Sequence, residues 1–335
     1  MSTIADVAAR AGVSKATASR ALSGGGYVSQ ETRARVQAAA SELAYVAHSS
    51  ATSLATGRSL SVGVIMPALD RWFFAELLAG IQEGLLASGQ DLVLYGIQEG
   101  TAERARLFEE VLPRRRLDGI IAVGIQPSAH ELERLIQVES PLVSVGAYSE
   151  DTSAVSIDDA AAARITTEHL IDLGHRDIAF LGGRADAATH AFGDEQRRSG
   201  YREAMNAAGL ADFIRHADGA PTMPGGYEAG VRILGDRQNR PTALVAVCDE
   251  AAIGGVIGAR RLGLSVPAEL SIVGIDDHEH AEMFALTTVR QQPRVQGRAA
   301  VDLLRQRMEA PDAVPERRVL PSELVVRAST AAPRT

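Results

Sequence analysis

The first part of the chain has the alternation of apolar residues and turn residues that is typical of short packed helices. Ile4, Val7 and Ala8 fall at i, i+3 and i+4, the spacing of one face of a helix. Gly12 ends that pattern and supplies the positive φ that a tight turn between two helices requires. Ser14 is a suitable N-cap for a second helix directly after it. The pattern predicts a helix-turn-helix, and an ordinary pair of core helices stays open as the alternative.

The second and third helices have predictable inner and outer faces. On the second helix we expect Thr17 and Leu22 to face inward. Its outward face then consists of Lys15, Ala16, Ser19 and Arg20. Ser29 can cap a third helix that runs to about Leu43, with an acidic residue in its first turn.

Residues 47–56 form a stretch of small residues around one leucine, Leu54. Such a short segment has too little helix propensity to form a helix by itself. A flexible linker is therefore one interpretation, and a helix that orders only on a partner is the other.

From residue 60 onward, continuous apolar strands alternate with helical segments. The strands are predicted at 61–67, 92–95, 119–123, 142–145, 178–181, 243–247 and 271–275. The helices are predicted at 73–87, 102–112, 163–173, 198–208 and 226–234. This order predicts parallel βαβ layers with helices on both faces. No turn after a strand reads Gly-x-Gly-x-x-Gly, so no dinucleotide site is indicated.

Length and composition narrow the class of protein. A chain of 335 residues suggests two or three domains. It has no apolar run of about 20 residues and no basic-then-apolar leader, so we expect a soluble, cytoplasmic protein without a membrane segment. The single cysteine, Cys248, excludes an intramolecular disulfide and a cysteine-cluster zinc site.

Charge is distributed unevenly along the chain. Residues 1–58 contain six Lys or Arg and three Asp or Glu, a net charge of +3. Because the whole chain carries −8, residues 59–335 carry −11. A basic head on an acidic body suits a protein that binds DNA at one end, since the body repels phosphate. Lys15, on the predicted second helix, is the only lysine of the chain.

Several motifs together resemble the lac repressor (LacI/GalR) family of regulators. They are Thr3-Ile-x-Asp-Val-Ala-x-x-Ala-Gly-Val-Ser14, Thr17-x-Ser19-Arg20-x-Leu22, Val28-Ser29-x-x-Thr32-Arg33-x-x-Val36, Arg197-x-x-Gly-Tyr201 and Val273-Gly-x-Asp-Asp277. The resemblance implies an α/β protein: a three-helix helix-turn-helix head and hinge, then a two-subdomain effector domain like the periplasmic binding proteins. It does not extend to the tetramer helix of some relatives, because the tail lacks a leucine heptad.

The resemblance also implies domain boundaries. The DNA-binding domain is expected at 1–46, the hinge at 47–58, and the effector-binding and dimerisation domain at 59–335. Within that domain, one subdomain spans about 60–159 plus 290–319, and the other about 160–288 plus 320–330. The chain is expected to cross between them near Asp159, Thr288 and Leu320.

The family pattern places the DNA contacts on the head and hinge. Lys15 and Arg20 can bond guanine edges and Ala16 can contact a thymine methyl, while hydroxyls suit phosphates. Leu54 would be the wedge inserted into the minor groove. Ala47 and His48 replace the usual Pro-Asn at the hinge entry. The full set implied by the resemblance is Thr3, Ser14, Lys15, Ala16, Thr17, Ser19, Arg20, Ser29, Ala51 and Leu54.

The same pattern implies an effector cleft. Its implied residues are Trp72, Phe73, His190, Phe192, Arg197, Cys248 and Asp276. Plain core packing is the alternative for the aromatic residues, and a structural ion pair is the alternative for Arg197 and Asp276. Cys248 stands where sugar-binding relatives usually have Asn, which weakens a plain monosaccharide assignment.

Metal binding and catalysis have no convincing candidates in the sequence. His278 and His280 are two residues apart, a spacing that points side chains to opposite sides of a strand, so we expect a solvated loop and no metal. No nucleophile elbow, HExxH motif or carboxylate pair is present, so neither an enzyme nor a cofactor is expected.

The sequence therefore predicts a homodimeric regulator, most often a repressor in this family. It would bind a palindromic operator and respond to a small-molecule effector, possibly a sugar or sugar derivative. Three alternatives stay open: a solute-binding protein of a transport system, a regulator with an effector that is not a sugar, and a sugar-processing enzyme. The first would need an export signal and no helix-turn-helix, and the last lacks catalytic residues.

Overall fold

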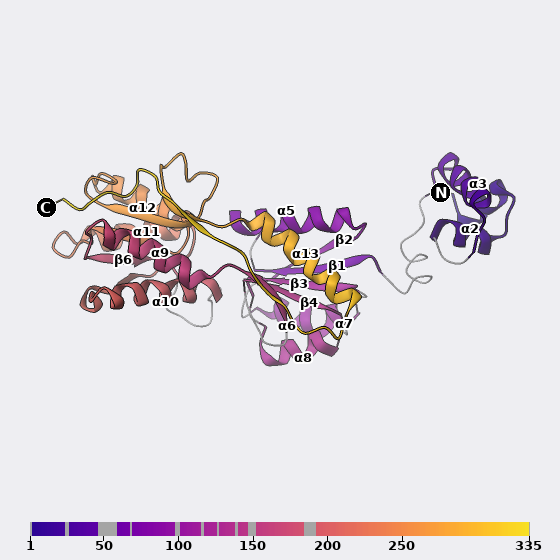
Figure 1. Ribbon diagram of the computed structural model, residues 1–335, viewed down its shortest axis with the longest axis horizontal. Coiled ribbons are helices and arrows are strands. Elements are labelled where there is room, and N and C mark those ends of the chain that lie inside the picture. Colours follow the sequence, from indigo (N-terminus) through magenta and orange to yellow (C-terminus); the bar gives the residue numbers. More distant parts are fainter. Residues whose placement is uncertain are drawn as a thin grey trace. The chain divides into compact units, whose positions relative to one another are not determined.

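The computed structural model describes residues 2–23, 27–45, 59–67, 69–97, 101–114, 117–125, 127–137, 140–146, 152–183 and 192–334. The chain divides into two compact units. One consists of residues 1–61 with 116–118, and the other of residues 62–115 with 119–335. Figure 1 colours them along the sequence.

In the described residues of the first unit there are three short helices: α1 (Ile4–Ala11), α2 (Lys15–Ser23) and α3 (Gln30–Glu42). Thr3 caps α1 through a reciprocal pair of hydrogen bonds with Asp6, a capping box. Gly12 follows with φ 67°, the left-handed conformation that the sequence predicted for this turn. The helix-turn-helix is therefore confirmed as a structure.

The inward face of α2 agrees only in part with the one we expected. Ala18 and Ala21 are its buried residues, and half-buried Leu22 packs against the same core, as predicted, whereas Thr17 is half-buried and is not part of that core. The small alanines allow α2 to approach α1 and α3 closely, with Val7 and Val36 filling the core between them. The prediction that Thr17 faces the core was wrong, because its hydroxyl pairs with that of Ser14 at the start of the helix.

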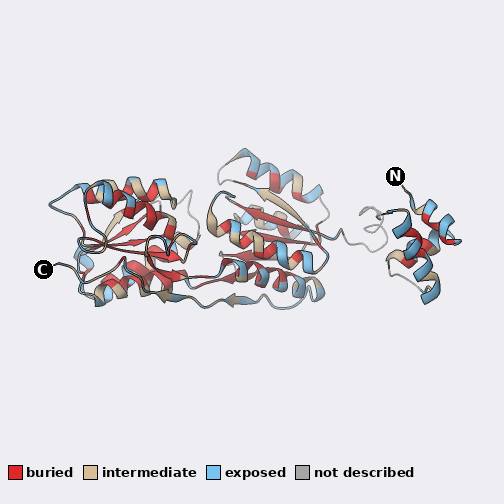
Figure 2. Ribbon diagram, turned by 90° about the horizontal axis from the view of Figure 1, so that it is seen from above, coloured by how far each residue is buried: buried red, intermediate tan, exposed pale blue. Residues whose placement is uncertain are grey.

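Two six-stranded sheets form the body, as Figure 2 shows by the red, buried strands in each. The first sheet has the order β11-β5-β4-β3-β1-β2. Its strands are β1 (Ser61–Met66), β2 (Asp91–Gly96), β3 (Gly119–Val123), β4 (Leu142–Val145), β5 (Ser153–Ser156) and β11 (Arg317–Val319). Strands β1, β3, β4, β5 and β11 pair in parallel. We call this sheet and its helices the first lobe.

Helices cover the first sheet on both faces (Figure 1). On one face α5 (Trp72–Ala87) packs against α13 (Pro293–Glu309). On the other lie α6 (Ala102–Arg106), the π-helical turn η1 (Leu107–Val111), α7 (Leu112–Arg114) and α8 (Ala129–Gln137). The single helix predicted over 102–112 is therefore interrupted by a π turn.

The second sheet has the order β12-β10-β9-β8-β6-β7. Its strands are β6 (Ile178–Leu181), β7 (Arg215–Ala217), β8 (Ala243–Ala246), β9 (Ser271–Asp276), β10 (Thr287–Arg290) and β12 (Glu323–Val325). Only β12 runs antiparallel to its neighbour among the pairings described. Every residue of β6, β8 and β9 is buried, which requires cover on both faces. We call this sheet and its helices the second lobe.

Among the residues that the structure describes, four helices and a short turn complete the second lobe. The helix α9 (Asp159–Asp172) packs on α10 (Phe192–Ala207), and α11 (Met223–Gly235) packs on α12 (Asp249–Arg261). The 3-10 turn η3 (Ala211–Phe213) follows α10. The chain passes between the lobes after β5, after β10 and after β11. The sequence missed α8, α12 and α13, and the fold class it predicted is confirmed.

Candidate functional site

The outward face of α2 carries exposed polar groups. Lys15, Ala16, Ser19 and Arg20 are all exposed, as the sequence predicted. Among the described residues no carboxylate forms an ion pair with Lys15 or Arg20; the Arg20 Nε donates to the Ala16 carbonyl at 3.2 Å. Lys15 at the start of α2 and Arg20 in its last turn are available to an acceptor-rich partner such as a base edge or a phosphate.

The predicted hydroxyl contacts on this unit already have partners. Ser14 Oγ accepts from the Thr17 backbone N–H at 3.1 Å, and Ser29 Oγ accepts from Thr32 N–H at 3.3 Å. The Thr3 hydroxyl takes part in the capping box. These hydroxyls fix the helix ends and remain exposed, so a role in binding stays a prediction. Ala51 and Leu54 lie outside the described residues.

A cavity of about 70 Å³ lies in the second unit where the two lobes meet. Phe73 and Phe74 contribute aromatic rings, and Gln291 and Gln296 contribute amides. Its charged lining residues are Arg71, Asp159, Asp194, Arg197 and Asp276. Small-molecule sites usually measure 300–1,000 Å³, so a ligand here requires the lobes or these side chains to move apart.

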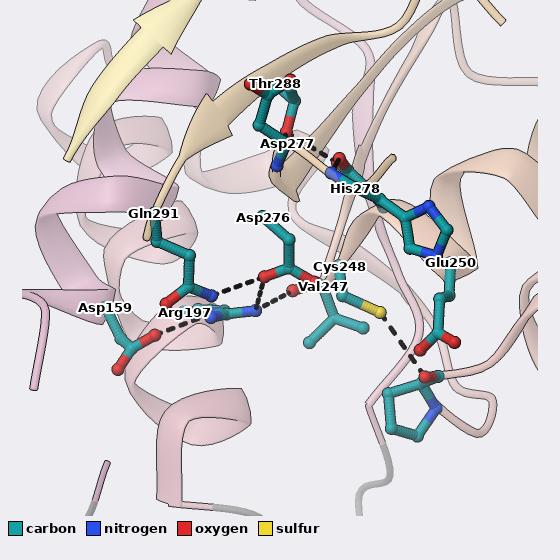
Figure 3. Close-up of polar contacts among 12 residues, drawn as sticks. Asp159, Arg197, Val247, Cys248, Glu250, Asp276, Asp277, His278, Thr288 and Gln291 are labelled. Atoms are coloured by element: carbon teal, nitrogen blue, oxygen red, sulfur yellow. Dashed lines mark hydrogen bonds and ion pairs between the residues drawn. The ribbon is translucent and has the colours of Figure 1, made fainter. Parts of the chain in front are cut away.

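Arg197 is the centre of a buried polar network in this cavity (Figure 3). Its Nε donates to Asp159 Oδ1 at 2.8 Å, and its Nη1 donates to the Val247 carbonyl at 2.7 Å. The same Nη1 lies 3.6 Å from Asp276 Oδ1. Burial opposes the charged form of Arg197, and the neighbouring carboxylates overcome it, so its pKa is raised. Arg197 is thus held rigidly as a cation.

Asp276 connects this network to the first lobe. Its Oδ1 accepts from Gln291 Nε2 at 2.6 Å, and Gln291 Oε1 accepts from Gln296 Nε2 at 2.9 Å. Burial raises the pKa of Asp276 to about 6, although Arg197 and Gln291 act in the opposite direction. The carboxylate is therefore fixed in direction at the boundary of the two lobes.

A second buried carboxylate, Asp249, was not predicted. It lies in the first turn of α12, where Oδ1 accepts from the Thr288 hydroxyl at 2.7 Å and Oδ2 accepts from the His278 N–H at 2.8 Å. Burial, reinforced by the charge of Asp276, raises the pKa of Asp249 to about 8. The only signal in the sequence was an Asp directly after an apolar strand, which is common at helix starts.

The structure brings together three of the residues that the resemblance implied. Phe73, Arg197 and Asp276 line the cavity. Trp72 instead lies against His278, with ring centroids 4.8 Å apart. Cys248 is buried beside the cavity, and its Sγ lies 3.5 Å from the Pro221 carbonyl. Burial raises its thiol pKa to about 12, so it stays a neutral thiol.

Two other implied residues cannot be placed on the cavity. His190 lies outside the described residues, and of Phe192 only the backbone is described, at the start of α10. Sequence reasoning missed Arg71 and Asp194, which line the cavity, and Glu250 beside it. These residues meet only because the first lobe packs against the second, and no local sequence pattern predicts that packing.

His278 and His280 lie on the loop and turn after β9, as expected, but the expectation that this loop is solvated was wrong for His278, which is buried. Their rings lie tilted to each other at a centroid distance of 4.8 Å. Within the described part of the chain, no group of three or more His, Cys, Asp or Glu residues is placed to hold a metal ion. Among the helices described there, none combines the length and apolar character needed to cross a bilayer.

Comparison with known proteins assigns both units. Residues 3–48 match the model of the bacterial regulatory proteins of the lacI family, and residues 167–330 match the periplasmic binding protein-like domain. The HTH-type transcriptional repressor PurR of Glaesserella parasuis serovar 5 (strain SH0165) is 31% identical over 342 residues, covering 98% of each chain.

Two solved structures are similar to the chain along almost its whole length. The lac repressor dimer bound to operator and the anti-inducer ONPF is 27% identical, with a TM-score of 0.87, and 99% of each chain is covered. The complex of the regulator CelR with cellobiose is 30% identical, with a TM-score of 0.72, and covers 98% of this chain and all of that one. The chain belongs to the lacI family of bacterial regulatory proteins and is a transcriptional repressor of that family.

Proposed function

We propose that this repressor binds a palindromic operator as a homodimer through α2 and the hinge, and that a small molecule in the interlobe cavity switches its affinity for DNA. The mechanism is binding alone and needs no catalytic step. It would act in the cytoplasm, with the domain boundaries expected above. Support comes from the exposed Lys15 and Arg20 on α2 and from the Arg197 network between the lobes.

We propose further that the effector is a neutral molecule rich in hydroxyl groups, such as a sugar or sugar derivative. Three lining carboxylates, Asp159, Asp194 and Asp276, outnumber the two lining arginines. Carboxylates accept hydrogen bonds from hydroxyls, whereas an anionic ligand would meet repulsion. The ring of Phe73 offers an apolar face for the C–H side of a sugar ring.

The Arg197 network is the observation that carries this proposal. The charge of Arg197 is compensated by Asp159 and Asp276, and its Nε and Nη1 are engaged by Asp159, Asp276 and the Val247 carbonyl, so it positions the carboxylates and is a weak attractor of an anion. Rigid, preorganised acceptors favour a ligand whose donors match their positions. A planar heterocycle is the second candidate, because the rings of Phe73 and Phe74 would stack on it equally well.

Calorimetric titration of the full chain can test the assignment. Neutral sugars, sugar phosphates and nucleobases are added separately, and we expect saturable heat with a member of the first class. Phe73→Ala should weaken that binding by about 2 kcal/mol through lost ring contact. Gln82→Ala, an exposed position on the same helix, is the matched control and should bind like the wild type. Binding only of sugar phosphates would overturn the neutral class.

A further inference from the structure

Two adjacent residues at the start of α5 reach from the first lobe to the second. Arg71 is the N-cap residue of α5, and Trp72 is its first residue. Arg71 Nε donates to Glu250 Oε2 at 3.1 Å, across 179 positions of sequence. Trp72 lies against His278 in the second lobe. Both contacts are made by the chain's own side chains, so their formation requires no bound molecule.

We propose that Arg71–Glu250 and Trp72–His278 form an interlobe latch that holds the cleft closed and that bars anionic ligands from it. This proposal adds detail to the proposed function. It depends on that function in one point only, namely that the cavity is the effector site.

The ion pair of the latch is substantially buried. The side chains of Arg71 and Glu250 are 17% and 13% exposed. The Arg71 guanidinium also lies 5.5 Å from the centroid of the Phe74 ring, and its Nη2 lies 3.8 Å from Cys248 Sγ. A pair shielded to this degree is held more strongly than a surface pair, because water screens it less. If either partner is removed, the other remains as an uncompensated charge.

The position of Arg71 is unfavourable for its own helix. A cation at the N-terminus of α5 lies at the positive end of the helix dipole, and Arg71 makes no side-chain capping bond there. Glu250 lies in the first turn of α12, where the dipole favours an acid. Within α5 the guanidinium contacts only the Phe74 ring among the contacts described, and its described contacts with charged groups lie in the other lobe.

The second half of the latch is fixed by its surroundings. His278 is buried, its N–H bonds Asp249, and its Nδ1 accepts from the His280 N–H at 2.9 Å. With Nδ1 as an acceptor, the ring is a neutral imidazole that can pack on the indole of Trp72. The two rings, tilted by 39° to each other, thus add a ring contact next to the ion pair, and both contacts would separate together if the lobes opened.

The latch has a consequence for ligand selection. Arg71 faces the cavity, but Glu250 already neutralises it. An anionic ligand would have to displace Glu250 and leave that carboxylate partly buried without its partner. A neutral ligand can enter beside the pair and leave it intact. Arg71 and Glu250 are therefore specificity-determining residues of the cleft.

Trp72 allows a direct test, because it is the only tryptophan in the chain. We would measure acrylamide quenching of its fluorescence in the full-length protein, without DNA or effector. The wild type should be poorly quenched. Glu250→Gln should raise the quenching constant about twofold or more, because loss of the pair favours open lobes. Glu279→Gln, an exposed acid on the same turn as His278, makes the same charge change and should leave quenching unaltered.

A charge swap tests whether increased quenching reflects loss of the Arg71–Glu250 pair or a general loosening of the fold. Arg71→Glu with Glu250→Arg should restore low quenching, whereas each single substitution raises it. Thermal melts followed by circular dichroism confirm that each variant is folded. Equal quenching of the wild type and Glu250→Gln, or a swap that fails to restore protection, would overturn the latch. Because no ligand or operator is used, this result is independent of whether the effector assignment is correct.

Discussion

Two neighbouring aspartates at the end of β9 show how single residues build the cleft. Asp276 and Asp277 have φ values of 138° and 56°, a region that costs a non-glycine residue about 1–3 kcal/mol. Asp277 bonds Arg290 at 2.6 Å and Arg327 at 2.7 Å, which holds the turn in place. Asp276 is thereby aimed at Arg197 and Gln291. The strained backbone is what directs its carboxylate between the lobes.

The buried Asp249 should make stability depend on pH. Its folded pKa of about 8 lies above the ordinary value of 3.8 for an aspartate, so its contribution is complete at low pH and is lost as pH rises towards 8. Asp249→Asn removes this titration and leaves that of Asp276 in place. We expect the unfolding free energy of the wild type, relative to this variant, to fall between about pH 5 and about pH 8. Urea denaturation at both pH values measures it, with the exposed Asp212→Asn as control; an unchanged difference would contradict the assignment.

We expect the exposed Lys15 to contact a base edge of the operator and not only a phosphate. Lys15→Ala is expected to weaken operator binding by about 1–3 kcal/mol and to relax preference at one base pair of each half-site. Gel shifts on cognate and random DNA measure both effects. Arg10→Ala removes the same charge from the same unit, but Arg10 is already paired with Glu42, and it should have a much smaller effect. Equal losses on both DNAs would mean that Lys15 contacts a phosphate.

At the scale of elements, local pattern predicted most strands and helices and could not predict their partners. The apolar runs of β1, β3, β6, β8 and β9 are buried on both faces, so their composition alone identifies them. Polar α13 begins at a proline, and short β11 and β12 are half-exposed, so none has a clear apolar signal. The latch could not be predicted for a related reason. Arg71 and Glu250 form a pair only because the N-termini of α5 and α12, which belong to different lobes, lie next to each other.

The packing of α5 on α13 depends on glycine. A Cβ at Gly80 would clash with the backbone oxygen of Arg294, and one at Gly297 would clash with the Leu77 carbonyl. The backbone cannot yield as a flexible side chain does, so Gly80→Ala should destabilise the protein by about 1–3 kcal/mol. Gly235→Ala, in α11 with nothing within 4 Å of a new Cβ, should be near neutral. Thermal melts compare the two, and equal melting temperatures would show that α5 can shift without cost.

For the whole molecule, function depends on the uneven distribution of charge and on coupling between the DNA-binding site and the cavity. A head of +3 on a body of −11 directs DNA to one end of the chain, while the body holds the cavity. A regulator of this kind needs the two sites to communicate through a change in the body. A change in the separation of the lobes is a suitable one, since the cavity, the Arg197 network and the latch all lie where the lobes meet.

Linkage makes the coupling testable from both ends. If effector changes operator affinity by some factor, operator must change effector affinity by the same factor, a coupling of about 1–3 kcal/mol. Leu54→Ala should then weaken specific DNA binding strongly and leave effector affinity in the free protein unchanged, because the hinge lies outside the cavity. Phe73→Ala should do the reverse: operator binding stays intact, and the response to effector shifts to about 30-fold higher concentrations, the equivalent of about 2 kcal/mol. Calorimetry with and without operator, and gel shifts with and without effector, give the two factors. If operator affinity is the same with and without effector, or if Phe73→Ala leaves the response at the same effector concentration, the cavity between the lobes is not the switch.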